Sequence, residues 1–515
     1  MTDEEKLNKC EEFKKKYFER MKLPTNLTSE RITIVKHLCE FHKLVEPQMI
    51  PRAKSSPPVK VQENEQQDIL GRFRYPDQDR KCITDDMDII KFYIEELQEE
   101  PPSFIEAGPR KHLYYEPETV RVAVLTSGGI APGLNTVIES IVERHVGVYG
   151  LRLGPLERGV ILGFQDGFIG LEENRYEELN PEKVRGWCRF GASKLGVGRG
   201  GEDVRKWLDV LRQNDIDILY VIGGNGSLCG AWKLGKAAER EGLNLSIGVI
   251  PKTMDNDILW VWQSFGFVTA FDRAAEIINV LHTEALSNRR VCVIQLFGAK
   301  SGHVAANASL ASGEVDAVLI PEEDFELKLV SQHVKQRVAR FRHAVIVMAE
   351  GARGIEKKDG RWRRWCAETR EHRDENLHRM QDTIKKALKH ERLEKYRVFG
   401  NQPQHVIRSV VPNSHDQVYC RRLADMVVDS CLGGYTKFMI SSWLTEYVLV
   451  PLIFPAKGGL TKEGYKTFPI GGIFWRTVLR STGQPPFLSP EARNAIERGE
   501  VQDEKKNESY RTIIS

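Results

Sequence analysis

Short apolar runs that end in glycine-rich turns recur along the middle of this 515-residue chain. One run, at residues 122–125, leads into Thr126-Ser127-Gly128-Gly129. A second run, at residues 216–222, leads into Gly223-Gly224-Asn225-Gly226. Because each turn is followed by apolar residues at helical spacing, the pattern is a repeated strand, glycine turn and helix. Such a repeat predicts an α/β fold with mostly parallel, doubly wound sheets.

The starts of the helices and three further strands follow from the same pattern. Pro132 suits the first turn of the helix after the first glycine turn. We expect Ser227 to cap the N-terminus of the helix after the second turn. Apolar runs at residues 245–250, 291–296 and 344–349 predict three more buried strands.

Length and composition divide the chain into regions. A chain of 515 residues is too long for one hydrophobic core, so residues 119–515 are expected to form two Rossmann-like lobes. Residues 1–118 are rich in Lys, Glu and Pro and predict an N-terminal extension, either a surface arm or an oligomer contact. The highly charged stretch at about residues 355–395 predicts a solvated helical insertion in the second lobe.

Several classes of protein are disfavoured by composition. A formal net charge of +3 gives no overall field that would attract nucleic acid. The nine cysteines contain no C-x-x-C pair, which disfavours a disulfide framework or a zinc site. The chain starts with charged residues, and no apolar run approaches the ~20 residues of a membrane span. We therefore expect a cytoplasmic protein with neither a membrane nor a nucleic acid as partner.

Two carboxylates follow the predicted strand at residues 245–250. Asp255 and Asp257 are two residues apart, and in an extended loop their side chains would point the same way. Two adjacent carboxylates can divide acid–base work, one taking a proton while the other holds a cation or a hydroxyl. An Asp-rich turn without chemistry is the alternative for this segment taken alone.

The glycine turns are candidate phosphate sites. Backbone N–H groups in front of a helix N-terminus favour an anion, although neither turn is a Walker A loop or a Rossmann fingerprint. A third glycine-rich segment, residues 196–201, contains Arg199, whose guanidinium could reach a transferring phosphoryl group. Turns kept only for packing, and a flexible surface loop around Arg199, are the alternatives.

Taken in order, these motifs resemble the phosphofructokinase family over roughly residues 105–490. The matching segments are Thr126–Gly129, Ala131–Asn135, Gly196–Gly201, Gly223–Ser227, Pro251–Asp257, Ser264–Ala270, His282–Ala285, Phe297–Gly302, Glu350–Ala352 and His405–Arg408. The long N-terminal arm, Ala107-Gly108-Pro109-Arg110 and Lys252 look most like the plant and trypanosomatid branch.

The resemblance implies a role for each matching position, in an active site in the cleft between the lobes. Asp255 would be the base and Arg199 would steady the phosphates, so both would be catalytic. The implied ATP-binding residues are Gly128, Gly129, Arg199, Gly200, Gly224, Asn225, Gly226 and Ser227. The implied substrate-binding residues are Thr253, Asp255, Asp257, Arg290, Phe297, Gly298, Ala299, Glu350, His405 and Arg408.

The resemblance also implies Mg²⁺ as cofactor and a homo-oligomer, a dimer or a tetramer. In the family, Arg290 would reach into the site of a neighbouring subunit, so that sites are completed across subunits. The phosphoryl donor depends on Gly226 and Lys252. Relatives that use pyrophosphate carry an aspartate at the position of Gly226, so the missing side chain favours ATP. Lys252 is shared with pyrophosphate users but also occurs in ATP users of the plant and trypanosomatid branch.

Three positions depart from the family pattern. Asn225 stands where the family has an aspartate that helps to hold Mg²⁺, so metal binding is expected to weaken. Ala299 replaces an arginine that would have reached phosphate or sugar, and Lys300 is a candidate replacement for it. Phe399 stands where the family has a basic residue that faces the sugar phosphate.

The sequence therefore predicts an ATP-dependent 6-phosphofructokinase of glycolysis, transferring the γ-phosphate of ATP to the 1-hydroxyl of fructose 6-phosphate. Two alternatives remain open. One is a kinase of the same fold for another sugar phosphate, suggested by Phe297, Ala299 and Phe399. The other is a catalytically weak regulatory subunit, suggested by Asn225.

Overall fold

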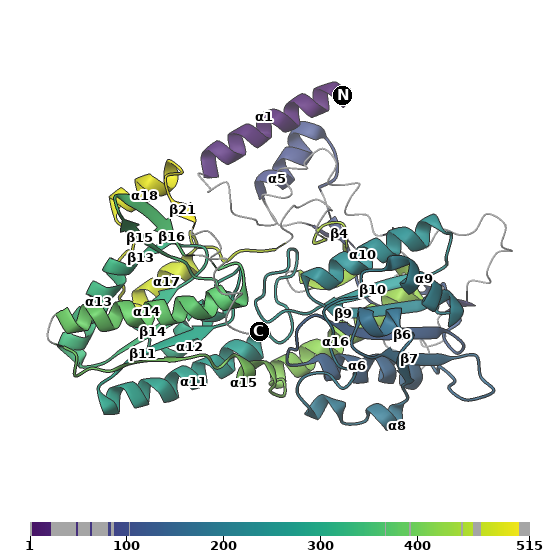
Figure 1. Cartoon of the computed structure of the whole chain (residues 1–515). Coiled ribbons are helices and arrows are strands. Elements are labelled where there is room, and N and C mark those ends of the chain that lie inside the picture. Colours follow the sequence, from purple (N-terminus) through teal and green to yellow (C-terminus); the bar gives the residue numbers. More distant parts are fainter. Residues whose placement is uncertain are drawn as a thin grey trace. The chain divides into compact units, whose positions relative to one another are not determined.

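The computed structural model describes residues 3–21, 48–49, 62–63, 81–83, 87–101, 103–365, 367–390, 393–443, 446–456 and 465–503 (Figure 1). Much of the expected N-terminal extension, at residues 22–47, 50–61, 64–80 and 84–86, lies outside this part of the chain. The chain divides into two compact units. Unit 1 consists of Met1–Gly266 and Arg408–Lys466, and unit 2 of Phe267–Ile407 and Thr467–Ser515.

Unit 1 is built on a nine-stranded sheet. Its strands, in spatial order, are β3 (Lys81–Ile83), β4 (Ser103–Glu106), β20 (Glu446–Pro451), β19 (Phe438–Trp443), β10 (Ser246–Pro251), β9 (Ile218–Gly223), β6 (Arg121–Ser127), β7 (Val160–Phe164) and β8 (Tyr176–Glu178). The five strands from β19 to β7 are parallel, and β3, β4, β20 and β8 are antiparallel to their neighbours. The predicted α/β fold with mostly parallel strands is confirmed. Strands β3 and β4 come from residues expected in the extension.

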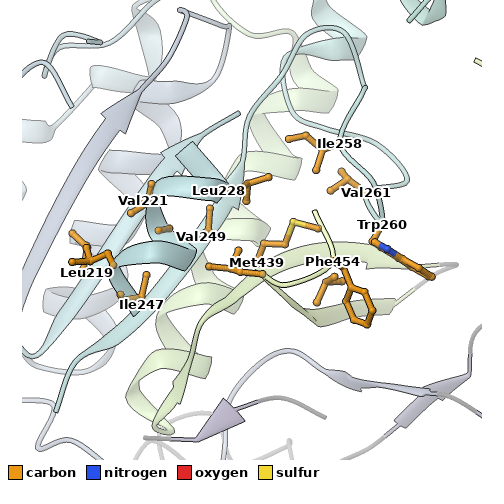
Figure 2. Close-up of a cluster of buried hydrophobic side chains, with 14 of the residues drawn as sticks. Leu219, Val221, Leu228, Ile247, Val249, Ile258, Trp260, Val261, Met439 and Phe454 are labelled. Atoms are coloured by element: carbon orange, nitrogen blue, oxygen red, sulfur yellow. The ribbon is translucent and has the colours of Figure 1, made fainter. Parts of the chain in front are cut away.

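Helices cover both faces of this sheet (Figure 1). They are α6 (Leu134–Glu143) and α16 (Ser414–Leu432) on one face, and α9 (Val204–Gln213) and α10 (Asn225–Arg240) on the other. Because side chains alternate along a strand, Val122 and Val124 pack with α6 and α16, while Leu125 packs with α9 and α10. Figure 2 shows part of the second core, where side chains of β9, β10 and β19 lie near Trp260 and Phe454.

The remaining elements of unit 1 are short or lie near the chain's start. They are α1 (Asp3–Met21), β1 (Gln48–Met49), β2 (Gln62–Glu63), α5 (Met87–Lys91), β5 (His112–Leu113), α7 (Phe168–Glu172), α8 (Pro181–Val184), β18 (Tyr435–Thr436), two π-helices at Phe92–Leu97 and Arg144–Val148, and a 3₁₀ turn at Trp187–Arg189. Helix α1 packs through Phe13, whose ring stacks on Phe92 with centroids 4.3 Å apart.

Unit 2 contains a fully parallel sheet of four strands, β12 (Ala317–Leu319), β14 (Ala344–Ala349), β11 (Val291–Leu296) and β17 (Val398–Asn401). Its helices are α11 (Phe267–Asn288), α12 (His303–Ser312), α13 (Leu327–Phe341), α14 (Arg370–His390), α17 (Ile473–Thr482) and α18 (Pro490–Glu497), with α15 (Gln404–Arg408) at the junction in the chain. Helices α13 and α14 pack against the parallel sheet in one core. A second sheet contains β13 (Phe325–Glu326), β15 (Gly354–Lys358), β16 (Arg361–Arg364) and β21 (Gln502–Asp503).

The structure differs from the sequence expectations at three places in these elements. Pro132 lies before α6 and not in its first turn, because Gly133 is the N-cap of that helix. The first part of the segment at residues 355–395 is a β-hairpin, not a helix, because Asp359 and Gly360 both take positive φ (51° and 76°) and form a tight turn between β15 and β16. Helix α14 follows and buries one apolar face. Ser227 is not the N-cap of α10, because the helix already begins at Asn225 with Gly224 as its N-cap.

Two findings concern the membrane-spanning and disulfide-rich classes of protein that the composition disfavours. Among the helices described, none combines the length and the apolar character that a membrane crossing requires. Six cysteines carry free thiols, namely Cys10, Cys188, Cys229, Cys292, Cys420 and Cys431.

Candidate functional site

The two carboxylates after β10 belong to one hydrogen-bonded loop. The hydroxyl of Thr253 donates to Asp257 Oδ1 (2.9 Å) and accepts from the backbone N–H of Asp255 (3.1 Å). Burial raises the pKa of Asp257, while the hydrogen bond from Thr253, its own backbone N–H and the charges of Lys466 and Lys252 act against that rise. Thr253 thus connects both acidic residues of the loop.

Asn256 fixes the shape of this loop. Its φ of 51° is left-handed, a conformation that asparagine tolerates better than most residues. The loop is therefore a turn at this point, and the extended geometry expected from the i, i+2 spacing is wrong. The amide Nδ2 of Asn256 donates to Trp262 O (3.2 Å), and Oδ1 accepts from the backbone N–H of Ser264 (3.0 Å). The segment that follows anchors the loop, because Ile258 and Trp260 are fully buried (Figure 2).

Lys252 joins the acidic loop to the first glycine turn. Its ammonium donates to Gly129 O (2.5 Å), and its side chain is 5% exposed. Burial and, to a lesser degree, the charge of Arg199 lower the pKa of Lys252 to about 8. The carboxylates of Asp257 and Asp255 act in the opposite direction. Both carboxylates, Arg199 and Gly129 therefore gather around this one ammonium group.

The two glycine turns lie next to each other at the carboxyl ends of β6 and β9. A Cβ atom added to Gly128, whose φ is +90°, would lie 3.5 Å from Lys252 Nζ and 3.9 Å from Ser227 Oγ. One added to Gly129 would lie 3.7 Å from the guanidinium of Arg199. Glycine therefore leaves the backbone of the first turn open toward cationic groups, as an anion site requires.

The Arg199 loop is anchored from β6 and α6. The backbone N–H of Gly128 donates to Gly198 O (3.1 Å), and the hydroxyl of Thr126 donates to Gly196 O (2.5 Å). Oδ1 of Asn135 accepts from the N–H of Lys194 (2.7 Å). Arg199 itself is exposed, and Gly200 beside it has a φ of +139°. The motif that contains Asn135 thus positions the loop, a role that the sequence alone did not assign.

The second glycine turn begins α10. Gly226 is exposed, and a Cβ added there would meet no atom within 4 Å, so the space beside it is open. The side-chain oxygen of Asn225 is buried and has no hydrogen-bond partner among the described residues. An orphaned amide oxygen is a ligand that suits Mg²⁺, which commonly takes one or two protein oxygens and completes its shell with substrate phosphates and water. In the described part of the chain no three His, Cys, Asp or Glu side chains are placed to hold a metal by themselves.

In unit 2, the turn after β11 holds three of the predicted substrate-binding residues. Gly298 has a φ of +125° and accepts a hydrogen bond from the N–H of Gly351 (3.0 Å). Phe297 is buried, Ala299 is half-buried and Lys300 is exposed. A Cβ on Gly351 would lie 2.1 Å from Ala299 O, so only glycine allows these two turns to approach.

Glu350 and His405 are both near arginines that sequence reasoning missed. Glu350 Oε2 accepts from Gln404 Nε2 (3.0 Å) and lies 3.7 Å from Nε of Arg373. Burial raises the pKa of Glu350, and the charge of Arg373 opposes that rise. Nε2 of His405 lies 3.3 Å from the guanidinium of Arg370. Both arginines belong to α14, far from these partners in sequence, so no local motif could have indicated them.

The other predicted residues are dispersed. Arg290 precedes β11 and donates to Glu284 Oε1 (2.7 Å), with its side chain 35% exposed. Arg408 ends α15 and is half-buried. Phe399 lies on β17. Unit 1 therefore holds the predicted ATP-binding residues, Thr253, Asp255, Asp257 and Arg408, and unit 2 holds Arg290, Phe297, Gly298, Ala299, Glu350 and His405.

Comparison with known proteins finds relatives in sequence and solved structures of similar fold. A family model described as phosphofructokinase matches residues 121–431. ATP-dependent 6-phosphofructokinase 4, chloroplastic, of Arabidopsis thaliana is 32% identical over 80% of this chain and 76% of its own length. The ATP-dependent 6-phosphofructokinase of Trypanosoma cruzi is 32% identical over 73% of this chain and 76% of its own. A pyrophosphate-dependent phosphofructokinase from Marinobacter aquaeolei shares the fold, with a TM-score of 0.58, 18% identity, and coverage of 72% of this chain and 93% of its own.

Proposed function

Because the chain belongs to the phosphofructokinase family and is therefore a phosphotransferase, we propose that it transfers the γ-phosphate of ATP to the 1-hydroxyl of fructose 6-phosphate. Relatives about one third identical that are named as ATP-dependent 6-phosphofructokinases support the proposal. The observation that carries it is the arrangement after β10, where Asp255, Asp257, Arg199 and the glycine turn meet around Lys252.

Asp255 is the base in this reaction. Its carboxylate accepts the proton of the 1-hydroxyl as that oxygen bonds to the γ-phosphorus, and the bond from the γ-phosphorus to the β,γ-bridging oxygen breaks to release ADP. The hydrogen bond from Thr253 fixes the side chain of Asp257, which supplies a second polar group near the reacting sugar hydroxyl. Arg199 and Lys252 place positive charge beside the glycine turn, where the phosphates carry negative charge.

The open space at Gly226 favours ATP as donor. A nucleotide needs room for its α-phosphate and nucleoside, and an added Cβ at Gly226 meets no atom within 4 Å. The N-terminus of α10, a helix of 16 residues, contributes N–H groups and a partial positive charge at the same place. Lys252 also occurs in relatives that use pyrophosphate, so it is compatible with either donor. The assignment of ATP as the donor therefore rests on Gly226.

Mg²⁺ is the proposed cofactor, and Asn225 would hold it through its buried, orphaned Oδ1. When bound, Mg²⁺ neutralises charge on the phosphates of ATP during transfer. An amide oxygen supplies no negative charge, so the chain relies more on the substrate phosphates for its affinity toward the metal.

Three further proposals rest on one or two residues each. The half-buried guanidinium of Arg290 supports a homo-oligomer in which it completes the site of a neighbouring subunit. Ala299 and Phe399 support the alternative that the acceptor is another sugar phosphate. Asn225, with its weaker metal ligand, supports the alternative of a catalytically weak regulatory subunit.

A donor-by-acceptor activity matrix tests the proposal. The purified chain is assayed with ATP and with pyrophosphate, each against fructose 6-phosphate and a panel of other hexose and pentose phosphates, at saturating Mg²⁺. We expect turnover with ATP and fructose 6-phosphate above that of every other pair. A preference for another acceptor selects the first alternative. The absence of turnover with every pair would contradict the kinase assignment and select the regulatory subunit.

A further inference from the structure

Helix α14 starts with two arginines and one acidic residue, Glu371, in its first turn. Arg370 is its first residue and Arg373 follows three residues later. The N-terminus of a helix already bears a partial positive charge, so acidic side chains are favoured there and arginines are not. Glu371 follows this rule, whereas Arg370 and Arg373 do not. What distinguishes the two arginines of this 21-residue helix is their position beside His405 and Glu350.

Both arginines lie beside residues assigned to the sugar phosphate. The guanidinium of Arg370 is 3.3 Å from His405 Nε2, and Arg373 Nε is 3.7 Å from Glu350 Oε2. The side chain of Arg373 is 19% exposed and that of Glu350 14%, so this pair is largely shielded from water. Arg370 is exposed and has access to a ligand from solvent.

A polar network fixes the start of α14 against the parallel sheet. Nε2 of Gln295, the fifth residue of β11, donates to the backbone oxygen of Arg373 (2.8 Å). Gln402, directly after β17, donates to Gln295 Oε1 (2.5 Å) and to Asp374 Oδ1 (3.1 Å). Gln295 is fully buried, so water does not compete for its amide, and its hydrogen bonds hold the start of α14 in place. The carboxyl ends of β11 and β17 thus position both arginines.

The same two strands carry the positions where positive charge is missing. Ala299 follows β11 and Phe399 lies on β17, and neither side chain can bind a phosphate. The acidic groups near the two arginines are Glu350, Glu371 and Asp374, and Asp374 is engaged by Gln402. Burial raises the pKa of Glu350, and the charges of Arg373 and Arg370 oppose that rise.

We propose that Arg370 and Arg373 of α14 form the subsite for the phosphate group of the acceptor, in place of the basic side chains absent at Ala299 and Phe399. Arg370 binds the phosphate directly together with His405, and Arg373 positions Glu350 and adds charge. The inference rests on the proposed function only in taking the acceptor to be a phosphorylated sugar. The inference adds how the acceptor is recognised: a guanidinium fork binds its phosphate monoester dianion.

Equilibrium binding of fructose 6-phosphate without ATP, measured by calorimetry on the full chain, tests the subsite. We expect Arg370→Ala to weaken binding about 10- to 100-fold, the loss of one charge-assisted hydrogen-bonded contact. Arg370→Lys keeps the charge but not the fork and should recover part of the affinity. Arg373→Gln should weaken binding about tenfold. Arg379→Ala, two turns along the same helix and paired with Glu375, is the matched control and should bind as wild type does.

The outcomes separate this inference from the proposed function. Weakened binding in the Arg370 variants supports the subsite whether or not the chain shows turnover. Turnover with unchanged affinity and unchanged KM for fructose 6-phosphate in both the Arg370 and Arg373 variants overturns the subsite and leaves the kinase intact. Wild-type protein that binds neither fructose 6-phosphate, nor any other sugar phosphate of the panel, nor inorganic phosphate also overturns it. Arg370 is exposed, so Arg370→Ala is expected to fold, and a melting temperature within a few degrees of wild type verifies this.

Discussion

The loop after β10 in unit 1 and the turns after β11 and β14 in unit 2 are both at carboxyl ends of parallel strands, but they obtain their charged groups differently. In unit 1, Thr253, Asp255, Asn256 and Asp257 are consecutive or nearly so, and hydrogen bonds within the loop set their geometry. In unit 2, Phe297, Gly298 and Ala299 have no ionisable side chain, Lys300 follows them, and the proposed subsite takes its positive charge from α14, more than 70 residues later.

This difference separates two tasks. A general base must be held within a few tenths of an ångström of its productive position. A short loop with hydrogen bonds between its own residues can hold it in this way. A phosphate dianion can be bound by charge from any nearby element, because guanidinium groups are long and the attraction is less dependent on exact position. A chain can therefore lose basic residues at one strand and recover the charge from a neighbouring helix, while the acidic loop has no such freedom.

The largest effect is expected from Asp255. Asp255→Ala removes the proposed base, so kcat should fall by roughly 10²- to 10⁴-fold. The affinity for ATP, measured by equilibrium binding, should remain close to wild type. Asp209→Ala, on the exposed side of α9, is the carboxylate control and should keep full activity. More than a tenth of the wild-type kcat in Asp255→Ala would contradict the role of the loop.

The second prediction concerns the donor. Gly226→Asp places a carboxylate in open space at the N-terminus of α10. The α-phosphate of ATP would overlap with this carboxylate and be repelled by its charge. We expect kcat/KM for ATP to fall at least about tenfold, a cost of ~1.4 kcal/mol, with a much smaller change for pyrophosphate. Gly226→Ala adds volume without charge and should have little effect. Equal losses for the two donors would show that Gly226 does not line the nucleotide site.

The third prediction uses pH to test Lys252. The folded pKa of about 8 lies below the 10.5 of an ordinary lysine, so the unfolded chain binds more protons between these values. The contribution of Lys252 to the free energy of unfolding therefore rises with pH across that window. Below pH 8 the buried ammonium is charged, and it destabilises the fold most. Lys252→Met lacks this dependence. The free energy of unfolding of wild type relative to Lys252→Met should increase by roughly 1–3 kcal/mol from pH 7.5 to 10, as measured by chemical denaturation. A constant difference would mean that Lys252 titrates normally.

The smallest effect is expected from Asn225. Asn225→Asp adds a negative charge beside the proposed metal, so the Mg²⁺ concentration for half-maximal activity should fall several-fold and turnover should rise modestly. A magnesium titration of both proteins measures this. An unchanged Mg²⁺ requirement would place the metal elsewhere. No activity in either protein at high Mg²⁺ would instead favour the regulatory-subunit alternative.

The amino-acid sequence predicts the strand framework well, because buried parallel strands are short apolar runs bounded by glycine turns. The predicted strands at residues 291–296 and 344–349 coincide with β11 and β14. Strands β19 and β20, which pair with each other antiparallel, were not predicted, since they lie beyond the recurring unit. The hairpin at residues 354–364 was predicted as helix, although Asp359-Gly360 is a tight-turn signal between its two strands.

The site is less accessible to prediction than the fold. Residues within one loop, such as Asp255 and Asp257, could be grouped by spacing alone. Arg370, Arg373 and Gln295 could not be grouped, because their contacts depend on where α14 packs against β11 and β17. Asn135 and Asn256 were also missed as positioning residues, since their importance comes from hydrogen bonds to backbone atoms of other segments.

The division of tasks between the two regions is tested most directly by one set of steady-state kinetics on wild type, Asp255→Asn and the double variant Arg370→Ala/Arg373→Gln, with fructose 6-phosphate as the varied substrate. The account predicts that Asp255→Asn loses kcat with little change in the affinity for fructose 6-phosphate. It predicts that the double variant raises KM for fructose 6-phosphate at least tenfold and keeps most of kcat at saturation. Loss of the same parameter in both variants would contradict it.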